Sequence, residues 1–133
     1  MTGMTALLIY IVWTLILALS YATYRLPLVL TGKKAANHWE RGKAVDDPAI
    51  LVRAKAAHLN CLENLPLFAA LVLVAAATGQ SDTVNAVAGF IVAARIGQSL
   101  VHLIGTSFPL VFIRASLFLA QVALMLYLAF ALM

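Results

Sequence analysis

Three charged residues, Glu63, Arg95 and Arg114, stand inside long apolar stretches of this chain of 133 residues. Within a bilayer, such a charge costs at least about 2.5–3.5 kcal/mol on insertion scales, so it is paired, hydrated or turned toward protein. We expect Glu63 to form an ion pair with Arg95. Arg114 then has no acidic residue left in the apolar sequence, which favours a role in binding an anionic ligand. The structural alternative is that the Arg114 side chain extends to the membrane surface.

Other polar residues recur in these stretches at spacings that place them on common helix faces, at about 100° per residue. They are Arg53, Asn60 and Asn64 beside Glu63, then Gln98, Ser99 and His102 beside Arg95, and Gln121 seven residues after Arg114. At a rise of about 1.5 Å per residue, these groups fall at similar depths in one half of the membrane. We therefore predict a polar layer near one membrane face, built jointly by several helices.

The histidines and the cysteine give no signal for a metal site. His38, His58 and His102 lack the spacing of metal ligands, and the single cysteine, Cys61, excludes an internal disulfide and a cysteine-based metal cluster. We predict that the protein has no metal site. His58 is interpreted as forming a hydrogen bond between helices, and Cys61 as a packing residue.

Composition identifies the elements that must position this polar layer. Hydrophobic residues make up 64% of the chain, charged residues make up 11%, and the mean hydropathy is +0.99. Soluble domains are about 45–50% apolar and about 25% charged, so a soluble globular domain and a disordered chain are both excluded. One helical span needs about 20 residues. We predict a single membrane domain over residues 1–133, an all-α, integral membrane four-helix up-down bundle. Its expected spans are about 4–30, 48–78, 82–105 and 109–132.

Charge and helix-terminating residues orient the bundle. Seven of the nine basic residues lie between positions 25 and 63. Because basic loops remain in the cytoplasm, we expect loop 32–47 on the cytoplasmic side and both termini on the other side. Gly32 suits a left-handed helix end. Asp47 and Pro48 suit a helix start, with the Asp47 side chain capping free amides.

Three segments resemble the MAPEG family, the membrane-associated proteins of eicosanoid and glutathione metabolism. The stretch from Arg53 to Phe68, RAKAAHLNCLENLPLF, resembles its second-helix signature, and is closest to microsomal glutathione transferase-like bacterial members. The segments Ala94-Arg95-Ile96 and Arg114-Ala115 resemble the family's arginines on the third and fourth helices. Gln98 and His102 stand where the transferases have histidine and tyrosine.

This resemblance implies a homotrimer that holds glutathione, as cosubstrate, between neighbouring subunits near the cytosolic face. Arg114 would be the catalytic residue, stabilising the thiolate. The residues implied in binding the cosubstrate belong to the predicted polar layer: Arg53, Asn60, Glu63, Arg95, Gln98 and His102.

We therefore expect a membrane-embedded, glutathione-dependent transferase or peroxidase that acts on an apolar small-molecule substrate, an electrophile. It would contact membrane lipid, lie in a bacterial inner membrane and have no nucleic-acid partner. One alternative is a non-catalytic lipid-binding or scaffold member of the same fold. Another is an accessory subunit of a larger membrane complex. A bound thiol peptide in the purified protein would separate the first of these from the other two.

Overall fold

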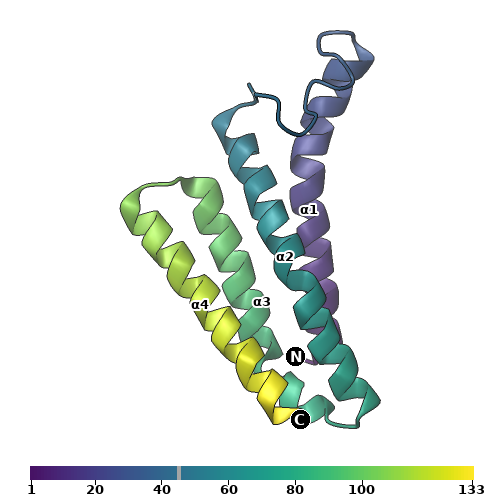
Figure 1. Cartoon of the computed structure of the whole chain (residues 1–133), viewed down its shortest axis with the longest axis vertical. Helices are drawn as coiled ribbons and strands as arrows, with labels where there is room; N and C mark the ends of the chain where they lie inside the picture. The colour runs from purple at the N-terminus through teal and green to yellow at the C-terminus, as the bar shows by residue number, and fades with distance from the viewer. Residues whose placement is uncertain (45) are drawn as a thin grey trace.

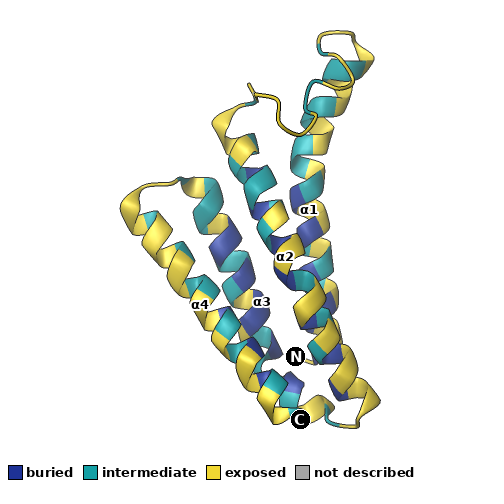
Figure 2. Ribbon diagram, viewed as in Figure 1, coloured by how far each residue is buried: buried dark blue, intermediate teal, exposed yellow. Residues whose placement is uncertain are grey.

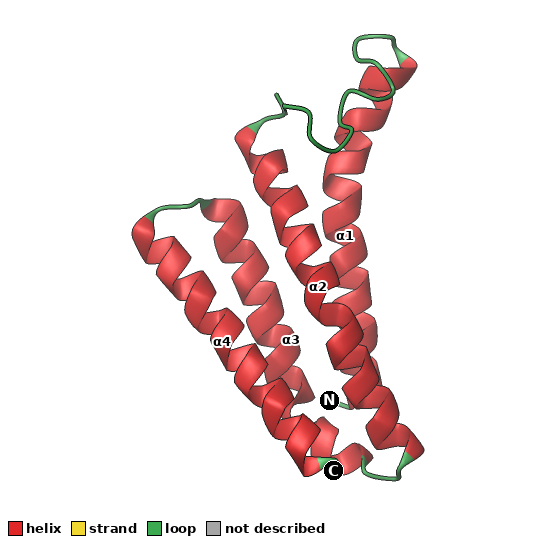
Figure 3. Ribbon diagram, in the orientation of Figure 1, coloured by secondary structure: helices red, strands yellow, loops and turns green. Residues whose placement is uncertain are grey.

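The computed structural model describes residues 1–44 and 46–133, and this part of the chain contains four helices and no strand. The helices are α1 (Gly3–Leu30), α2 (Ala49–Ala77), α3 (Ser81–Ile104) and α4 (Phe108–Ala131). Figures 1 and 3 show them as antiparallel neighbours joined by short connections, apart from the longer loop between α1 and α2. The prediction of an all-α four-helix bundle is confirmed, and each helix end lies within one residue of its expected place.

The outer faces of the bundle are apolar. All four helices are long and apolar enough to cross a membrane. Exposed residues run along the outer faces in Figure 2, and they include Leu15, Leu19, Phe90 and Phe130. In water, an apolar surface of this extent would drive association, whereas in a bilayer it contacts lipid chains. The chain is therefore an integral membrane protein.

The helices form two pairs that separate toward one end. Helix α1 packs along α2 and α3 along α4, while α4 touches α2 only sparsely. Figure 1 shows the pairs converging at the end that holds both termini. There, a Cβ on Gly3 would lie only 2.8 Å from Val84 Cγ1, and the Gly3 N–H donates to Asn85 Oδ1 at 2.7 Å. Between α1 and α2, the Tyr21 hydroxyl and His58 Nδ1 lie 2.5 Å apart, which confirms His58 as an interhelical hydrogen-bonding residue.

The loop after α1 folds back onto that helix through Asp47. Arg25 donates to the Asp47 carboxylate at 3.1 Å, and Trp39 Nε1 donates to it at 2.8 Å. The Arg25 guanidinium lies 5.1 Å from the centres of the Tyr21 and Trp39 rings. The predicted capping role of Asp47 is wrong, since Pro48 occupies the cap position of α2 and no side chain caps that end. The Asp47 carboxylate instead binds the partly buried guanidinium of Arg25, which forms a stronger hydrogen bond than a free backbone amide.

The two ends of this loop are also fixed by local chemistry. Gly32 ends α1 with a φ of +74°, the left-handed conformation predicted for it. Near the other end, Asp46 accepts hydrogen bonds from Lys34 at 2.6 Å and from His38 at 2.8 Å. The hydrogen bonds from Lys34 and then from His38 lower the pKa of Asp46 to about 2. The contacts of Asp46 and Asp47 therefore tie the described part of this loop to α1 and to the residues that follow it.

Candidate functional site

A polar pocket of about 240 Å³ opens between α2 and α4, near the end where the helix pairs separate. Its lining comes from three helices: Asn60 and Glu63 of α2, Gln98 of α3, and Arg114, Ala115 and Phe118 of α4. Asn60 and Glu63 are three positions apart on α2, and Arg114 and Phe118 are four positions apart on α4, so each of these two pairs lies on one side of its helix. The structure thus brings together four residues that the sequence selected from separate segments: Asn60, Glu63, Gln98 and Arg114.

Two opposite charges in this pocket have no ion-pair partner among the described residues. The ion pairs of the described chain join residues of the segment 25–47, and neither Glu63 nor Arg114 takes part in one. Glu63 is exposed on the single chain, and Arg114 is half-buried. A free carboxylate within a bilayer costs at least about 2.5–3.5 kcal/mol, a cost that a positive group beside Glu63 would offset. Arg114 correspondingly offers an unused guanidinium to a negative group.

The expected ion pair between Glu63 and Arg95 is not formed. Arg95 is only 1% exposed, and its Nη1 donates to Asn60 Oδ1 at 2.6 Å. Its guanidinium also lies 5.6 Å from the centre of the Tyr10 ring. The physical reason is helix rotation, because Asn60 and Glu63 stand about 60° apart around α2. The Asn60 oxygen therefore reaches Arg95 of α3, whereas Glu63, which lines the pocket with Asn60, does not.

Two further predicted residues lie at the edge of this site. Arg53 Nε donates to the Leu103 carbonyl at 3.0 Å, so it ties the start of α2 to the end of α3. His102 lies close enough to Arg53 and Arg114 to experience both charges. Neither Arg53 nor His102 lines the polar pocket. Arg53 and Arg114 therefore bring two positive charges close to His102 at the loop side of the pocket.

Behind the pocket, buried amides form a hydrogen-bonded chain. Gln121 Nε2 donates to Gln98 Oε1 at 2.9 Å and to the Leu117 carbonyl at 3.0 Å. Gln98 Nε2 donates to Asn60 Oδ1 at 3.4 Å, the same oxygen that Arg95 binds. We did not predict this role for Gln121 from sequence. Its spacing of seven residues from Arg114 placed it on the right face of α4, but spacing cannot identify hydrogen-bond partners.

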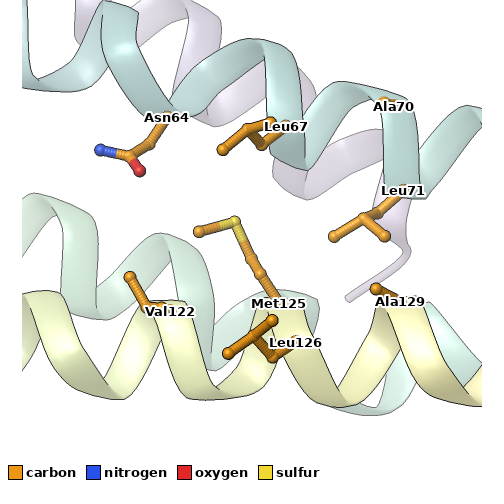
Figure 4. Close-up of a pocket in the computed structure, with 8 residues that line it drawn as sticks. All are labelled: Asn64, Leu67, Ala70, Leu71, Val122, Met125, Leu126 and Ala129. Atoms are coloured by element: carbon orange, nitrogen blue, oxygen red, sulfur yellow. The ribbon is translucent and has the colours of Figure 1, made fainter.

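A separate apolar pocket lies further along the same two helices, α2 and α4. It measures about 330 Å³ and is lined by Asn64, Leu67, Ala70 and Leu71 of α2 and by Val122, Met125, Leu126 and Ala129 of α4. Figure 4 shows Asn64 at one end, with Leu67, Leu71 and Met125 beyond it between the two helices. On each helix the apolar lining begins within about one turn of the polar lining. The sequence did not indicate this pocket, since none of its apolar residues stands out from the spans around it.

Comparison with models of protein families agrees with the resemblance drawn from sequence. The model of the MAPEG family matches residues 3–133, which include all four helices. No curated protein and no solved structure matches the chain.

Proposed function

Since the chain belongs to the MAPEG family, we propose that it is a glutathione-dependent transferase or peroxidase acting on apolar electrophiles from the bilayer. One observation carries this proposal: an arginine and a glutamate without ion-pair partners among the described residues share a polar pocket, and an apolar pocket lies further along the same two helices. Such an arrangement suits a charged cosubstrate and an apolar substrate that meet near the membrane surface.

The chemistry of the lining fits glutathione. This tripeptide carries carboxylates, peptide carbonyls, an ammonium group and a thiol. Arg114 can donate to anions through a planar guanidinium that stays charged at neutral pH. Glu63 can accept from the ammonium group, and Asn60 can hydrogen-bond a carboxylate or a carbonyl. We assign Arg53 and His102 to the approach of the cosubstrate, because at the loop side Arg53 adds positive charge and the imidazole of His102 can form a hydrogen bond.

Glutathione, when bound, supplies the sulfur nucleophile. A free thiol with a pKa near 8.5 is mostly protonated at neutral pH, and an adjacent cation favours its thiolate form. We assign that role to Arg114, which is the cation that lines the polar pocket. The apolar side chains of α2 and α4 would hold the electrophile and exclude water from the reacting atoms.

Assembly and orientation belong to the same proposal. We propose a homotrimer with loop 32–47 on the cytoplasmic side, which places the polar pocket near the cytosolic face. The exposed Glu63 supports assembly, because a neighbouring subunit can shield it from lipid. Exposed small residues, such as Ala76, Ala86 and Ala93, also permit close contact between helices of different subunits.

A second candidate function is non-catalytic lipid binding. It is favoured by the apolar pocket, which at about 330 Å³ is larger than the polar pocket of about 240 Å³. A lipid chain lying along α2 and α4 would occupy that pocket without any need for Arg114. The two candidates therefore differ in what they require of this arginine.

The deciding experiment measures glutathione binding and conjugation of a generic apolar electrophile by the purified protein in lipid nanodiscs. We expect saturable binding, thiolate formation near neutral pH and turnover, with turnover lost in Arg114→Ala. The matched control is Arg41→Ala, an exposed loop arginine without an ion pair among the described residues. Wild-type protein that binds lipid but neither binds glutathione nor turns over would reject the enzyme and support the lipid-binding candidate.

A further inference from the structure

We propose that Arg95, Gln98 and Gln121 form a positioning chain that fixes the side-chain amide of Asn60. The chain turns the Asn60 oxygen into the bundle and its NH2 group into the polar pocket. Beside Asn60, the pocket would then bind only a ligand atom that accepts a hydrogen bond, such as a carboxylate or carbonyl oxygen. The orientation follows from the contacts alone, whereas the identity of the ligand rests on the proposed function.

Arg95 fixes one end of the chain. A guanidinium donates hydrogen bonds and cannot accept them. Because Arg95 Nη1 lies 2.6 Å from the side chain of Asn60, the atom facing it must be the Asn60 oxygen. The reverse orientation would set the NH2 group of Asn60 against a guanidinium that is 1% exposed. Two donors would then face each other away from water, which costs the full desolvation penalty of both.

A backbone carbonyl fixes the other end. The Leu117 carbonyl accepts hydrogen bonds and cannot donate them, so the side chain of Gln121 must turn its nitrogen toward it, at 3.0 Å. The same nitrogen donates to Gln98 at 2.9 Å, which requires the Gln98 oxygen on that side. The Gln98 nitrogen is thereby directed to Asn60 Oδ1, at 3.4 Å. Both ends of the chain therefore specify the same orientation of Asn60.

The remaining donor is the NH2 group of Asn60. Asn60 lines the polar pocket, and its Nδ2 makes no hydrogen bond to the rest of the described chain. Gln98 and Gln121 are 4% and 1% exposed, so water does not compete for their amides. Reversing the chain would break both fixed ends at once. Arg95 and Gln121 therefore act on the ligand through Asn60, without lining the pocket themselves.

The test compares Arg95→Gln with Arg95→Lys. Glutamine can donate or accept, so Arg95→Gln removes the 2.6 Å constraint on Asn60 and leaves only the longer contact from Gln98 at 3.4 Å, whereas lysine only donates and preserves both constraints. We expect Arg95→Gln to weaken glutathione binding about tenfold, the loss of one hydrogen bond to a charged group. Arg95→Lys should keep most of the affinity. Asn85→Asp is the control, because its carboxylate can still accept from the Gly3 N–H at the far end of α3.

A direct readout comes from NMR of protein labelled with ¹⁵N in its asparagine side chains. The chain has four asparagines, and the signal that disappears in Asn60→Asp identifies Asn60. In ligand-free wild type this NH2 group should exchange its hydrogens with water readily, since it faces the pocket. In Arg95→Gln we expect a second population of molecules, in which the Asn60 NH2 group is protected from hydrogen exchange. Gln121→Glu provides an independent variant should Arg95→Gln not fold. A carboxylate cannot donate to the Leu117 carbonyl and would accept from Gln98, which turns the Gln98 oxygen toward Asn60, so the two ends of the chain would no longer favour the same orientation.

The outcomes separate this inference from the proposed function. Rapid exchange of the Asn60 NH2 group in a protein that binds no glutathione supports the orientation and rejects the cosubstrate. A protected Asn60 amide in wild type overturns the inference. So does unchanged glutathione affinity in a folded Arg95→Gln or Gln121→Glu variant.

Discussion

Replacement of Arg114 by alanine tests the chemistry of the polar pocket most directly. This side chain is half-buried, lines the pocket and has no ion-pair partner among residues 1–44 and 46–133. If it stabilises a thiolate, its removal should impair catalysis far more than folding. The two effects can be estimated separately.

The catalytic effect follows from charge and distance. A guanidinium and a thiolate about 4 Å apart attract by about 4 kcal/mol at an effective dielectric constant of about 20. Loss of one donor to a developing anion in an enzyme site costs roughly 2.7–4 kcal/mol. Because Arg114 is partly exposed, the lower end applies. We expect conjugation to slow by about a hundredfold, and the pKa of the bound thiol to rise by about two units.

The structural effect should be small. No acidic side chain of the described chain loses its partner when Arg114 is removed, so no buried charge is left uncompensated. We expect the melting temperature to change by less than about 4 °C, equivalent to about 1 kcal/mol for a chain of this size. Arg114→Lys keeps the charge but loses the planar fork, so it should retain part of the activity.

The assay is thiolate absorbance of protein-bound glutathione across pH, measured together with single-turnover conjugation in nanodiscs. Wild type should hold thiolate at a pH about two units below that of free glutathione, and Arg114→Ala should not. Arg41→Ala should behave as wild type. Equal thiolate titration and equal turnover in wild type and Arg114→Ala would refute the assigned role of Arg114, even if glutathione binds.

Three further predictions address charge, packing and pH. Glu63→Gln should not lower the melting temperature of the protein, because Glu63 has no ion-pair partner in the described chain. The same substitution should weaken glutathione binding. A large loss of stability would contradict this prediction. Gly3→Ala should destabilise the bundle by about 1–3 kcal/mol, because its Cβ would lie 2.8 Å from Val84 Cγ1, whereas Gly89→Ala, with its nearest atom at 4.0 Å, should not. The pKa of Asp46 is about 2, below its ordinary 3.8, so its contribution to loop stability should be complete above pH 3.8 and lost as the pH falls through about 2. Tryptophan fluorescence would follow that transition, and its completion well above pH 4 would contradict the assignment.

The fold was largely predictable, because its signals are local. Four apolar runs of spanning length identify the helices, and glycines identify several of their ends. Gly32, with a φ of +74°, ends α1 as the sequence indicated, and Gly79, with a φ of +71°, follows the end of α2. The start of α2 was different. Asp47 looked like a helix cap, but Arg25, 22 residues earlier in the chain, binds its carboxylate. A partner at that separation leaves no trace in the local sequence.

The sequence predicted how deep in the membrane the site residues lie, but not how each helix is rotated about its axis. A rise of 1.5 Å per residue places Asn60, Glu63, Gln98 and Arg114 in one half of the membrane, and the structure gathers all four around one pocket. Which of them faces α3 depends on how each helix is turned about its axis, to within about 60°. That rotation is set by packing. As a result, Arg95 donates a hydrogen bond to Asn60 and forms no ion pair with Glu63.

Because Arg95 binds Asn60 and not Glu63, the pocket can recognise a different class of ligand. Had Glu63 neutralised Arg95, Arg114 would be left alone and the pocket would suit a simple anion. Instead, the charge of Arg95 is held by an amide oxygen and lies over the Tyr10 ring, and Glu63 remains free beside Arg114. A pocket with one unpaired charge of each sign suits a ligand that carries both. An ammonium group that pairs with Glu63, and an anion that pairs with Arg114, offset the cost of holding each charge in the membrane. For that reason we propose a zwitterionic thiol peptide, rather than an anionic lipid, as the ligand of the polar pocket.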